Sequence, residues 1–239
     1  LFFSKKFKPK FTVVFENDEG DIVSSLFIQK YKITFYKSFL PVAYFCGIAT
    51  LPEYRKKGIA SQLVSFAENY CKKKKIQIFV LVPAEKSLFD YYEKLGYTQV
   101  FDKGEEPINF FDANENLYSA FRKFQKYYRV KNFCIQKTFS DFKTIREELL
   151  ISGGNRYNLW GMAKISDVLF CSKLLEENIP NLSFDFSHFL NLSPAIEKEK
   201  VNSSISSEQR KVFCRLFFGY HIDEFNEEKY NIFPRHNPI

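Results

Sequence analysis

Residues 48–60 constrain the fold most, because they join an apolar strand to an amphipathic helix through a basic turn. Three cations, Arg55, Lys56 and Lys57, precede Gly58, and apolar residues at helical spacing follow it. The first N–H groups of a helix have no partner inside the helix, and the helix dipole favours negative charge there. Glycine lets an anion approach the main chain without a Cβ in the way. The pattern therefore predicts an anion-binding turn that opens a helix.

The neighbouring segments predict a sheet on which this helix packs. Buried strands are expected at 41–51 and 76–82, because both are too apolar for surface strands. Strands at 11–16 and 22–28 read as a hairpin, and a short helix at 88–95 is expected to end at Gly96. The helix after the turn should bury the face formed by Ile59, Leu63, Phe66, Ala67 and Tyr70.

Two motifs carry a resemblance to a known family. The spacing Arg55-x-x-Gly58-x-Ala60 and the run Tyr92-Glu93-Lys94-Leu95-Gly96-Tyr97 resemble the pyrophosphate loop and the Tyr-x-x-x-Gly-aromatic motif of the GNAT superfamily of N-acetyltransferases. The resemblance covers about residues 11–101. It implies an α+β fold, with a mixed, mostly antiparallel sheet flanked by helices. The superfamily normally begins with a further strand and helices, so these N-terminal elements are expected to be missing from this sequence.

The resemblance also implies a co-substrate, acetyl-CoA, and site residues, with no metal. The backbone of Ile48, Ala49 and Thr50 would contact the thioester and pantetheine. Tyr92 matches the tyrosine whose phenol protonates the coenzyme A thiolate, although an ordinary core tyrosine has the same pattern. The pyrophosphate would lie against Arg55, Lys56, Lys57, Gly58, Ile59 and Ala60.

The general base stays open at this point. The strand at 42–51 lacks the Glu that some members of the superfamily carry, and Val82-Pro83-Ala84 stands where an Asn often follows the next strand. The remaining candidates are Glu53, Glu85, Asp90 and His188. Cys46 is a further candidate nucleophile, but a buried structural cysteine is the simpler interpretation.

Length suggests two units, an acetyl-CoA-binding domain at 1–103 and a smaller α+β lobe at 104–239. A chain ending near residue 103 is therefore expected to keep acetyl-CoA binding. Trp160-Gly161-Met162 and the run at 216–220 resemble the enhanced-intracellular-survival branch, which implies a reduced sterol-carrier-like C-terminal lobe. Helices are expected at 117–128, from a cap at Ser140, at 167–177, and after a Ser206-x-x-Gln209 capping box; short strands are expected at 133–136 and 160–165.

Composition bears on the competing functions. The net charge of +7 includes the run Lys72 to Lys75, which suits the end of a helix better than a nucleic-acid site. Five scattered cysteines and the absence of a long apolar run predict a cytoplasmic protein without a membrane span. The expected acceptor is a small-molecule or peptide amine, and self-association stays open. Alternatives are a non-catalytic acyl-CoA-binding module and, behind it, a lipid- or nucleic-acid-binding protein.

Overall fold

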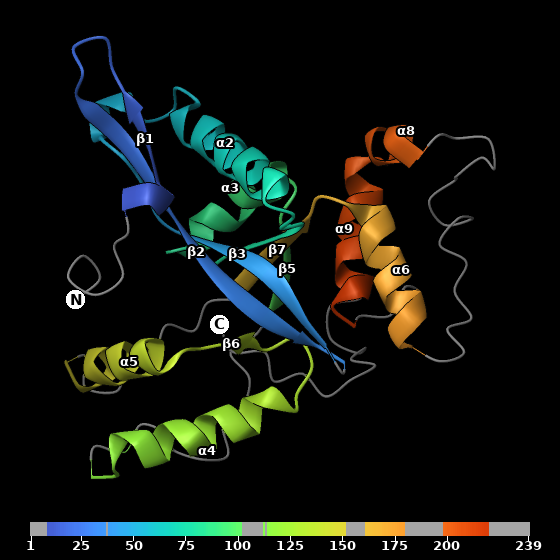
Figure 1. The fold of residues 1–239 in the computed structure, drawn as a ribbon. Helices are drawn as coiled ribbons and strands as arrows, with labels where there is room; N and C mark the ends of the chain where they lie inside the picture. Colours follow the sequence, from blue (N-terminus) through green and yellow to red (C-terminus); the bar gives the residue numbers. More distant parts are fainter. Residues whose placement is uncertain are drawn as a thin grey trace.

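The computed structural model describes residues 9–36, 38–101, 112, 114–151, 161–179 and 198–219, which form a seven-stranded sheet with helices on both faces (Figure 1). Only β3 and β4 pair in parallel; the other neighbours are antiparallel. The mixed, mostly antiparallel sheet predicted from the sequence is confirmed. The strands lie in the order β1 (Thr12–Glu16), β2 (Ile22–Phe35), β3 (Ser38–Thr50), β4 (Ile78–Leu81), β7 (Gly161–Ile165) and β5 (Thr98–Phe101), and β6 (Ile135–Gln136) pairs with β2.

The two faces of the sheet bury different helices. Along β3, Val42 belongs to one core cluster and Phe45 to the other, as alternation along a strand requires. Helices α2 (Ile59–Lys73) and α3 (Phe89–Lys94) pack on the Phe45 face. The Val42 face is covered by α6 (Val168–Asn178), α8 (Lys198–Ser204) and α9 (Ser207–Phe217). Helices α4 (Leu117–Arg129) and α5 (Phe139–Ile151) share a third, smaller core.

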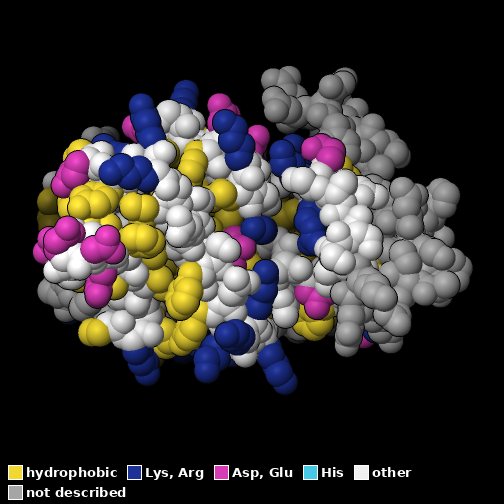
Figure 2. Space-filling view, turned by 90° about the horizontal axis from the view of Figure 1, so that it is seen from above, with side chains coloured by type: hydrophobic (Ala, Val, Ile, Leu, Met, Phe, Trp, Pro, Cys, Tyr) yellow, Lys and Arg dark blue, Asp and Glu magenta, His cyan; other side chains and the backbone are white. Residues whose placement is uncertain are grey.

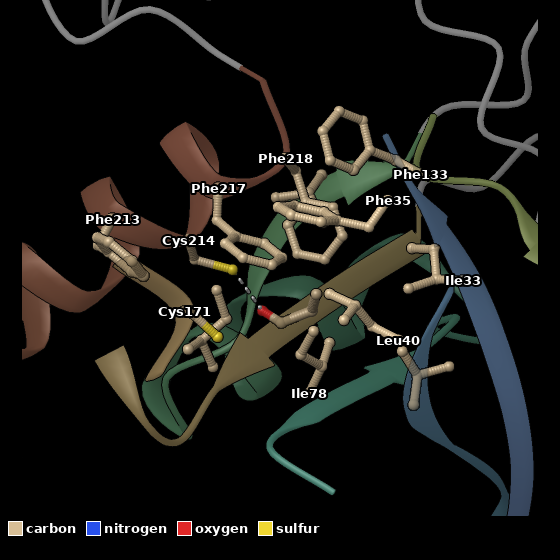
Figure 3. Packing of buried hydrophobic residues seen from close by; sticks show 14 of the residues in the cluster. Ile33, Phe35, Leu40, Ile78, Phe133, Cys171, Phe213, Cys214, Phe217 and Phe218 are labelled. Carbon is tan, nitrogen blue, oxygen red and sulfur yellow. Dashed lines mark hydrogen bonds between the residues drawn. The ribbon is translucent and has the colours of Figure 1, made fainter. Parts of the chain in front are cut away.

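Aromatic packing attaches α9 to the sheet (Figure 3). The ring of Phe217 stacks on Phe35 of β2, with 4.8 Å between centroids, and Phe218 meets Phe101 of β5 at 5.0 Å. The Cys214 thiol donates a hydrogen bond to the Ala163 carbonyl of β7 at 3.5 Å. These contacts join the described C-terminal helix to strands from both halves of the chain.

The expected boundary at residue 103 does not separate two sheets. β7 comes from the segment 104–239, yet it lies between β4 and β5 and pairs with both, with Ala163 opposite Val80 and Thr98. β6, also from that segment, pairs with β2. An apolar strand that is buried on both faces needs partners on both edges, and the first domain supplies them. Among the described residues, the expected lobe therefore has no sheet of its own.

Several local predictions need correction. Phe66 is 62% exposed, so it does not belong to the buried face of α2. That face includes Glu68 instead. β2 continues to Phe35 instead of ending at residue 28. α5 begins at Phe139, so Ser140 lies inside the helix. The cap is a reciprocal pair: the Asp141 N–H donates to Thr138 Oγ1 at 3.2 Å, and the Thr138 N–H donates to Asp141 Oδ2 at 2.7 Å.

Other local predictions are confirmed. The Ser206–Gln209 capping box is present at the start of α9. Gly96 adopts a positive φ of 88° after α3, as its C-cap role requires. Lys72 and Lys73 lie in the last turn of α2. Trp160 and residues 1–8 lie outside the described residues.

Candidate active site

The parallel pairing of β3 and β4 stops in the middle of β3. Its last pair is Phe45 with Leu81, and Pro83, which has no N–H, follows β4. From residue 46 to Thr50, β3 continues with β2 alone among the described strands. The predicted contact residues Ile48, Ala49 and Thr50 all lie on this stretch, and an acyl group could approach their main chain there.

A bulge distorts β3 where this open edge begins. Ser25 pairs with Ala49 and Phe27 with Cys46, so two residues of β3 oppose one residue of β2. The first of them, Gly47, has a φ of +58°, and a Cβ there would lie 2.2 Å from the Phe27 ring. Only glycine fits without displacing that ring, so the bulge depends on this position.

Gly58 opens α2 as predicted. It is the N-cap residue, with a left-handed φ of 78°, and its carbonyl accepts the first helical hydrogen bond, from the Gln62 N–H at 3.1 Å. The N–H groups of Ile59 and Ala60 come before that bond, so they have no acceptor within the helix. A Cβ built on Gly58 would meet only Ser61 Oγ, at 3.8 Å. This helix start therefore has open space beside N–H groups that have no helical acceptor, an arrangement that can bind an anion.

The three predicted cations surround this helix start and are exposed. Arg55 Nε donates to the Thr50 carbonyl at 3.0 Å, so this side chain braces the turn against the end of β3. Lys57 Nζ lies 5.0 Å from the centroid of the Tyr54 ring, whose hydroxyl accepts a hydrogen bond from Asn17 Nδ2 at 3.1 Å. The basic turn is thus tied to both the sheet and the β1–β2 turn.

Charged side chains of both signs are spread over one face of the molecule. On the face shown in Figure 2, Lys and Arg side chains are spread out, with Asp and Glu side chains between them. This distribution gives no support there to the nucleic-acid alternative, which would favour a continuous basic stripe.

Tyr92 lies on α3 and is 6% exposed. Its ring packs between Tyr91, with centroids 5.1 Å apart, and Tyr97, at 6.1 Å. Burial raises the pKa of Tyr92 to about 12, with a smaller contribution from Tyr91. Burial raises the pKa of Tyr44 on β3, and Cys46, Glu148 and Tyr92 add smaller contributions in that order. Tyr92 and Tyr44 therefore lie within electrostatic range of each other. Tyr92 is therefore neutral at physiological pH and lies near β3.

Its neighbour Tyr91 has a different environment. Burial raises the pKa of Tyr91, and Ser61 at the start of α2 opposes that rise. Tyr91 thus lies near the helix start, whereas Tyr92 lies near β3.

The candidates for a base or nucleophile are less well placed. Glu53, Glu85 and Asp90 are exposed, and His188 lies outside the described residues. Burial raises the pKa of the Cys46 thiol to about 11, against a smaller opposing effect of Lys137, and the thiol donates to the Phe27 carbonyl at 3.8 Å. A thiol with that pKa is protonated at neutral pH, which fits a structural cysteine.

Sequence reasoning missed a polar group between β2, β3 and the start of α5. The Tyr31 hydroxyl lies 2.8 Å from Gln29 Oε1 and 3.0 Å from Asp141 Oδ1. Asp141 is only 5% exposed. It lies 110 residues away from Tyr31 in the sequence. The Thr138-x-x-Asp141 spacing is a capping pattern and was the one available signal for this helix start.

A mixed sheet with one open parallel edge, a glycine-capped helix and a buried tyrosine near that edge are the features expected from the sequence motifs. Residues 2–100 match the family model described as an acetyltransferase (GNAT) domain. This part of the chain is therefore similar to GNAT acetyltransferase domains. A search of the curated proteins finds no match.

Three solved structures illustrate the likeness. A probable N-acyltransferase from Enterococcus faecalis V583 is 25% identical, with a TM-score of 0.35, and the match covers 38% of this chain and 22% of that one. A GCN5-related N-acetyltransferase from Anabaena variabilis is 20% identical, with a TM-score of 0.44 and coverages of 57% and 37%. Eis1 from Mycobacterium abscessus is 13% identical, with a TM-score of 0.48 and coverages of 67% and 43%. The chain thus spans less than half the length of these three proteins.

The described residues contain no group of three or more His, Cys, Asp or Glu side chains arranged to hold a metal ion. None of the helices in the described ranges combines the length and apolar character needed to cross a membrane.

Proposed function

We propose that this chain is an acetyl-CoA-dependent N-acetyltransferase that transfers the acetyl group directly to a primary amine. The observation that carries the proposal is the open edge of β3 beyond the Phe45–Leu81 pair. That edge leads through the basic turn to Gly58 at the start of α2, and Tyr92 lies near the same strand. We therefore infer a main-chain edge for a carbonyl on β3, a site for phosphate at the start of α2 and a proton donor on α3 beside that strand.

Each part has a physical role in the proposed reaction. The N–H groups that open α2, with Arg55, Lys56 and Lys57, bind the pyrophosphate. Main-chain N–H groups at Ile48, Ala49 and Thr50 orient the thioester and stabilise the negative charge that develops on its oxygen. The amine nitrogen attacks the carbonyl carbon, the C–N bond forms, the C–S bond breaks, and the thiolate leaves.

Tyr92 would give its proton to that thiolate. The reference pKa of a thiol, about 8.5, lies below that of a phenol, about 10, so this transfer is unfavourable between fully hydrated groups. The transfer therefore depends on the apolar surroundings raising the proton affinity of the sulfur. Burial raises the pKa of the nearby Cys46 thiol to about 11 and that of Tyr92 to about 12, which supports a small difference in proton affinity between a buried thiolate and the phenol.

The acceptor must lose its own proton before it attacks. The exposed carboxylates Glu53, Glu85 and Asp90 do not single out a base, so we assign this proton to solvent. The resemblance to the enhanced-intracellular-survival branch stays a prediction. It is supported by the sequence runs at 160–162 and 216–220, while a separate sterol-carrier-like lobe is not carried forward because β7 belongs to the main sheet.

Release of coenzyme A thiol tests the proposal. The purified chain is incubated with acetyl-CoA and a panel of polyamines, aminoglycosides and lysine peptides, and thiol release is followed with each. We expect amine-dependent release with at least one class and recovery of the acetylated amine. Tight acetyl-CoA binding without amine-dependent release would support the non-catalytic acyl-CoA-binding module instead.

A further inference from the structure

One lysine already places a primary ammonium beside the candidate active site. In the β2–β6 ladder, Lys32 pairs with Gln136, so the next residue, Lys137, comes opposite Tyr31. Lys137 Nζ lies 4.7 Å from the centroid of the Tyr31 ring and 5.9 Å from that of Tyr44. The two rings are themselves 6.2 Å apart. Ammonium groups are attracted to aromatic faces at such distances, so the two tyrosines hold the cation between them.

The ammonium lies near the open edge of β3. Tyr44 pairs with Val80, one residue before the last β3–β4 pair, and Cys46 is the first residue beyond it. The charge of Lys137 acts on the Cys46 thiol, lowering its pKa against the larger effect of burial. Tyr44 is also coupled to Tyr92. Tyr44 is therefore close to the ammonium on the Val42 face of the sheet, and the proposed proton donor packs on the Phe45 face within its electrostatic range.

The backbone on both sides of Lys137 is fixed. On one side, β6 is bonded to β2. On the other, α5 starts with the Thr138–Asp141 cap, in which Thr138 Oγ1 also donates to Asp141 Oδ2 at 2.6 Å. The Tyr31 hydroxyl lies 3.0 Å from the second oxygen of the same carboxylate. The segment that carries the amine is thus held in register with the aromatic pair that receives it.

We propose that Lys137 is an acceptor of the chain's own acetyltransferase activity, so that the enzyme acetylates itself at this residue. This inference rests on the proposed function. The Lys137 ammonium gives one proton to solvent, its nitrogen bonds to the acetyl carbon, and the C–S bond of acetyl-CoA breaks. The bonded nitrogen gives its second proton to water, while Tyr92 protonates the thiolate and regains a proton from water. The products are an acetamide on Lys137 and free coenzyme A, with one proton released.

The substrate class follows from the same contacts. The pair of tyrosines accepts a primary ammonium on a flexible alkyl chain, and an external amine of that kind would compete with Lys137. The acetamide formed on Lys137 is neutral, so it loses the electrostatic attraction to the rings. Acetylation of Lys137 therefore removes the internal competitor for this position.

Mass spectrometry of the unmodified full chain tests the proposal. The protein is incubated with acetyl-CoA, digested at intervals, and the acetylated fraction of each lysine is measured. Lys143 is the internal control, because it lies on α5 and is exposed. We expect Lys137 to be modified at least about tenfold faster than Lys143, at a first-order rate that does not change over a tenfold range of protein concentration. Equal labelling of the two lysines, or a Lys137 rate that rises with protein concentration, would overturn the proposal.

Two variants separate enzymatic from chemical acetylation. Gly58→Glu should abolish the excess labelling of Lys137 and leave the slow background at Lys143. Tyr31→Leu should label about 3- to 10-fold more slowly than the parent, and Tyr31→Phe, which keeps the aromatic face but loses the hydroxyl contact with Asp141, should label faster than Tyr31→Leu. Calorimetry should show unchanged acetyl-CoA affinity for both Tyr31 variants, a readout independent of turnover. Persistent excess labelling in folded Gly58→Glu would contradict the proposal.

The amine panel distinguishes failure of the self-acetylation proposal from failure of the proposed function. If external amines are acetylated while Lys137 stays unmodified, the inference fails and the proposed function stands. If neither thiol release nor labelling occurs with bound acetyl-CoA, both fail.

Discussion

Lys164 Nζ on β7 lies 2.8 Å from Glu68 Oε2 on α2. This ion pair joins two residues that are 96 positions apart in the sequence. Lys164 also donates to the Leu95 carbonyl at 2.8 Å, and the Tyr97 hydroxyl donates to Glu68 Oε1 at 3.1 Å. The Glu68 side chain is 6% exposed and that of Lys164 is 25% exposed. A buried carboxylate needs such partners, and most of them come from outside its own helix.

Glu68→Gln should therefore destabilise the fold. The amide keeps the shape of the side chain but leaves the Lys164 ammonium without its charged partner. We expect a loss of about 1–3 kcal/mol in the free energy of unfolding, below the full cost of breaking a buried pair because Lys164 reaches solvent. Urea denaturation measures it. Glu115→Gln, at the Glu115–Lys123 pair, is the control and should change stability less, because the side chains of Lys123 and Glu115 are 58% and 21% exposed. Equal effects of the two substitutions would argue against this role for Glu68.

A chain that ends at residue 103 should fail to fold, in contrast to the expectation from sequence. Without β7, strands β4 and β5 lose their shared partner, and Glu68 loses Lys164. The core on the Val42 face also loses α6 and α9. Circular dichroism and calorimetry with acetyl-CoA would check this. A cooperative thermal transition together with acetyl-CoA binding in the truncated chain would disprove the integral role of β7.

Gly58→Glu should weaken acetyl-CoA binding by at least about tenfold, or about 1.4 kcal/mol. The substitution places a carboxylate at the helix start where the pyrophosphate is proposed to bind. Gly20→Glu is a matched control, since Gly20 also has a positive φ, of 86°, with open space around it, but lies in the β1–β2 turn. Isothermal titration should show a loss of affinity for Gly58→Glu alone. The phosphate-loop assignment is wrong if the two folded variants bind equally.

Alkaline pH should destabilise the protein through its buried tyrosines. Burial raises the pKa of Tyr92 and of Tyr36 to about 12, and that of Tyr97 well above 10. The folded state thus holds these protons more tightly than the unfolded chain, whose tyrosines titrate near 10. The stability that these tyrosines contribute is fully present below about pH 10 and is lost as the pH rises through 12. At pH 11 each tyrosine with a pKa of about 12 should lower the free energy of unfolding by about 1.4 kcal/mol. Urea midpoints at pH 8, 10 and 11 should fall in that order; constant midpoints would refute the linkage.

Local sequence signals were sufficient for much of the first hundred residues. Gly58 and the apolar run after it predicted the start of α2, and Gly96 predicted the end of α3. The buried face of α2 was misjudged, because the predicted apolar face included Phe66 and left out Glu68. Its burial depends on Lys164, a partner that helical periodicity in α2 cannot reveal.

The long-range arrangement could not be predicted. The extended character of 161–165 was predicted, but its position between β4 and β5 depends on pairing with strands far away in the sequence. Lys137 and Tyr31 come together through the β2–β6 register, which no local pattern encodes. The candidate acetyl-CoA loop was therefore accessible from sequence, whereas the acceptor side was not.

Single-turnover acetyl transfer by Tyr92→Phe at saturating acetyl-CoA tests the central claim most directly. Phenylalanine keeps the ring that packs against Tyr91 and Tyr97 but removes the proton. We predict unchanged acetyl-CoA affinity and a transfer rate lower by about two to four orders of magnitude, the usual contribution of a positioned acid. Tyr91→Phe, the matched control on the same helix, should transfer at close to the parent rate. Transfer by Tyr92→Phe at the parent rate would contradict the assignment of Tyr92 as the general acid.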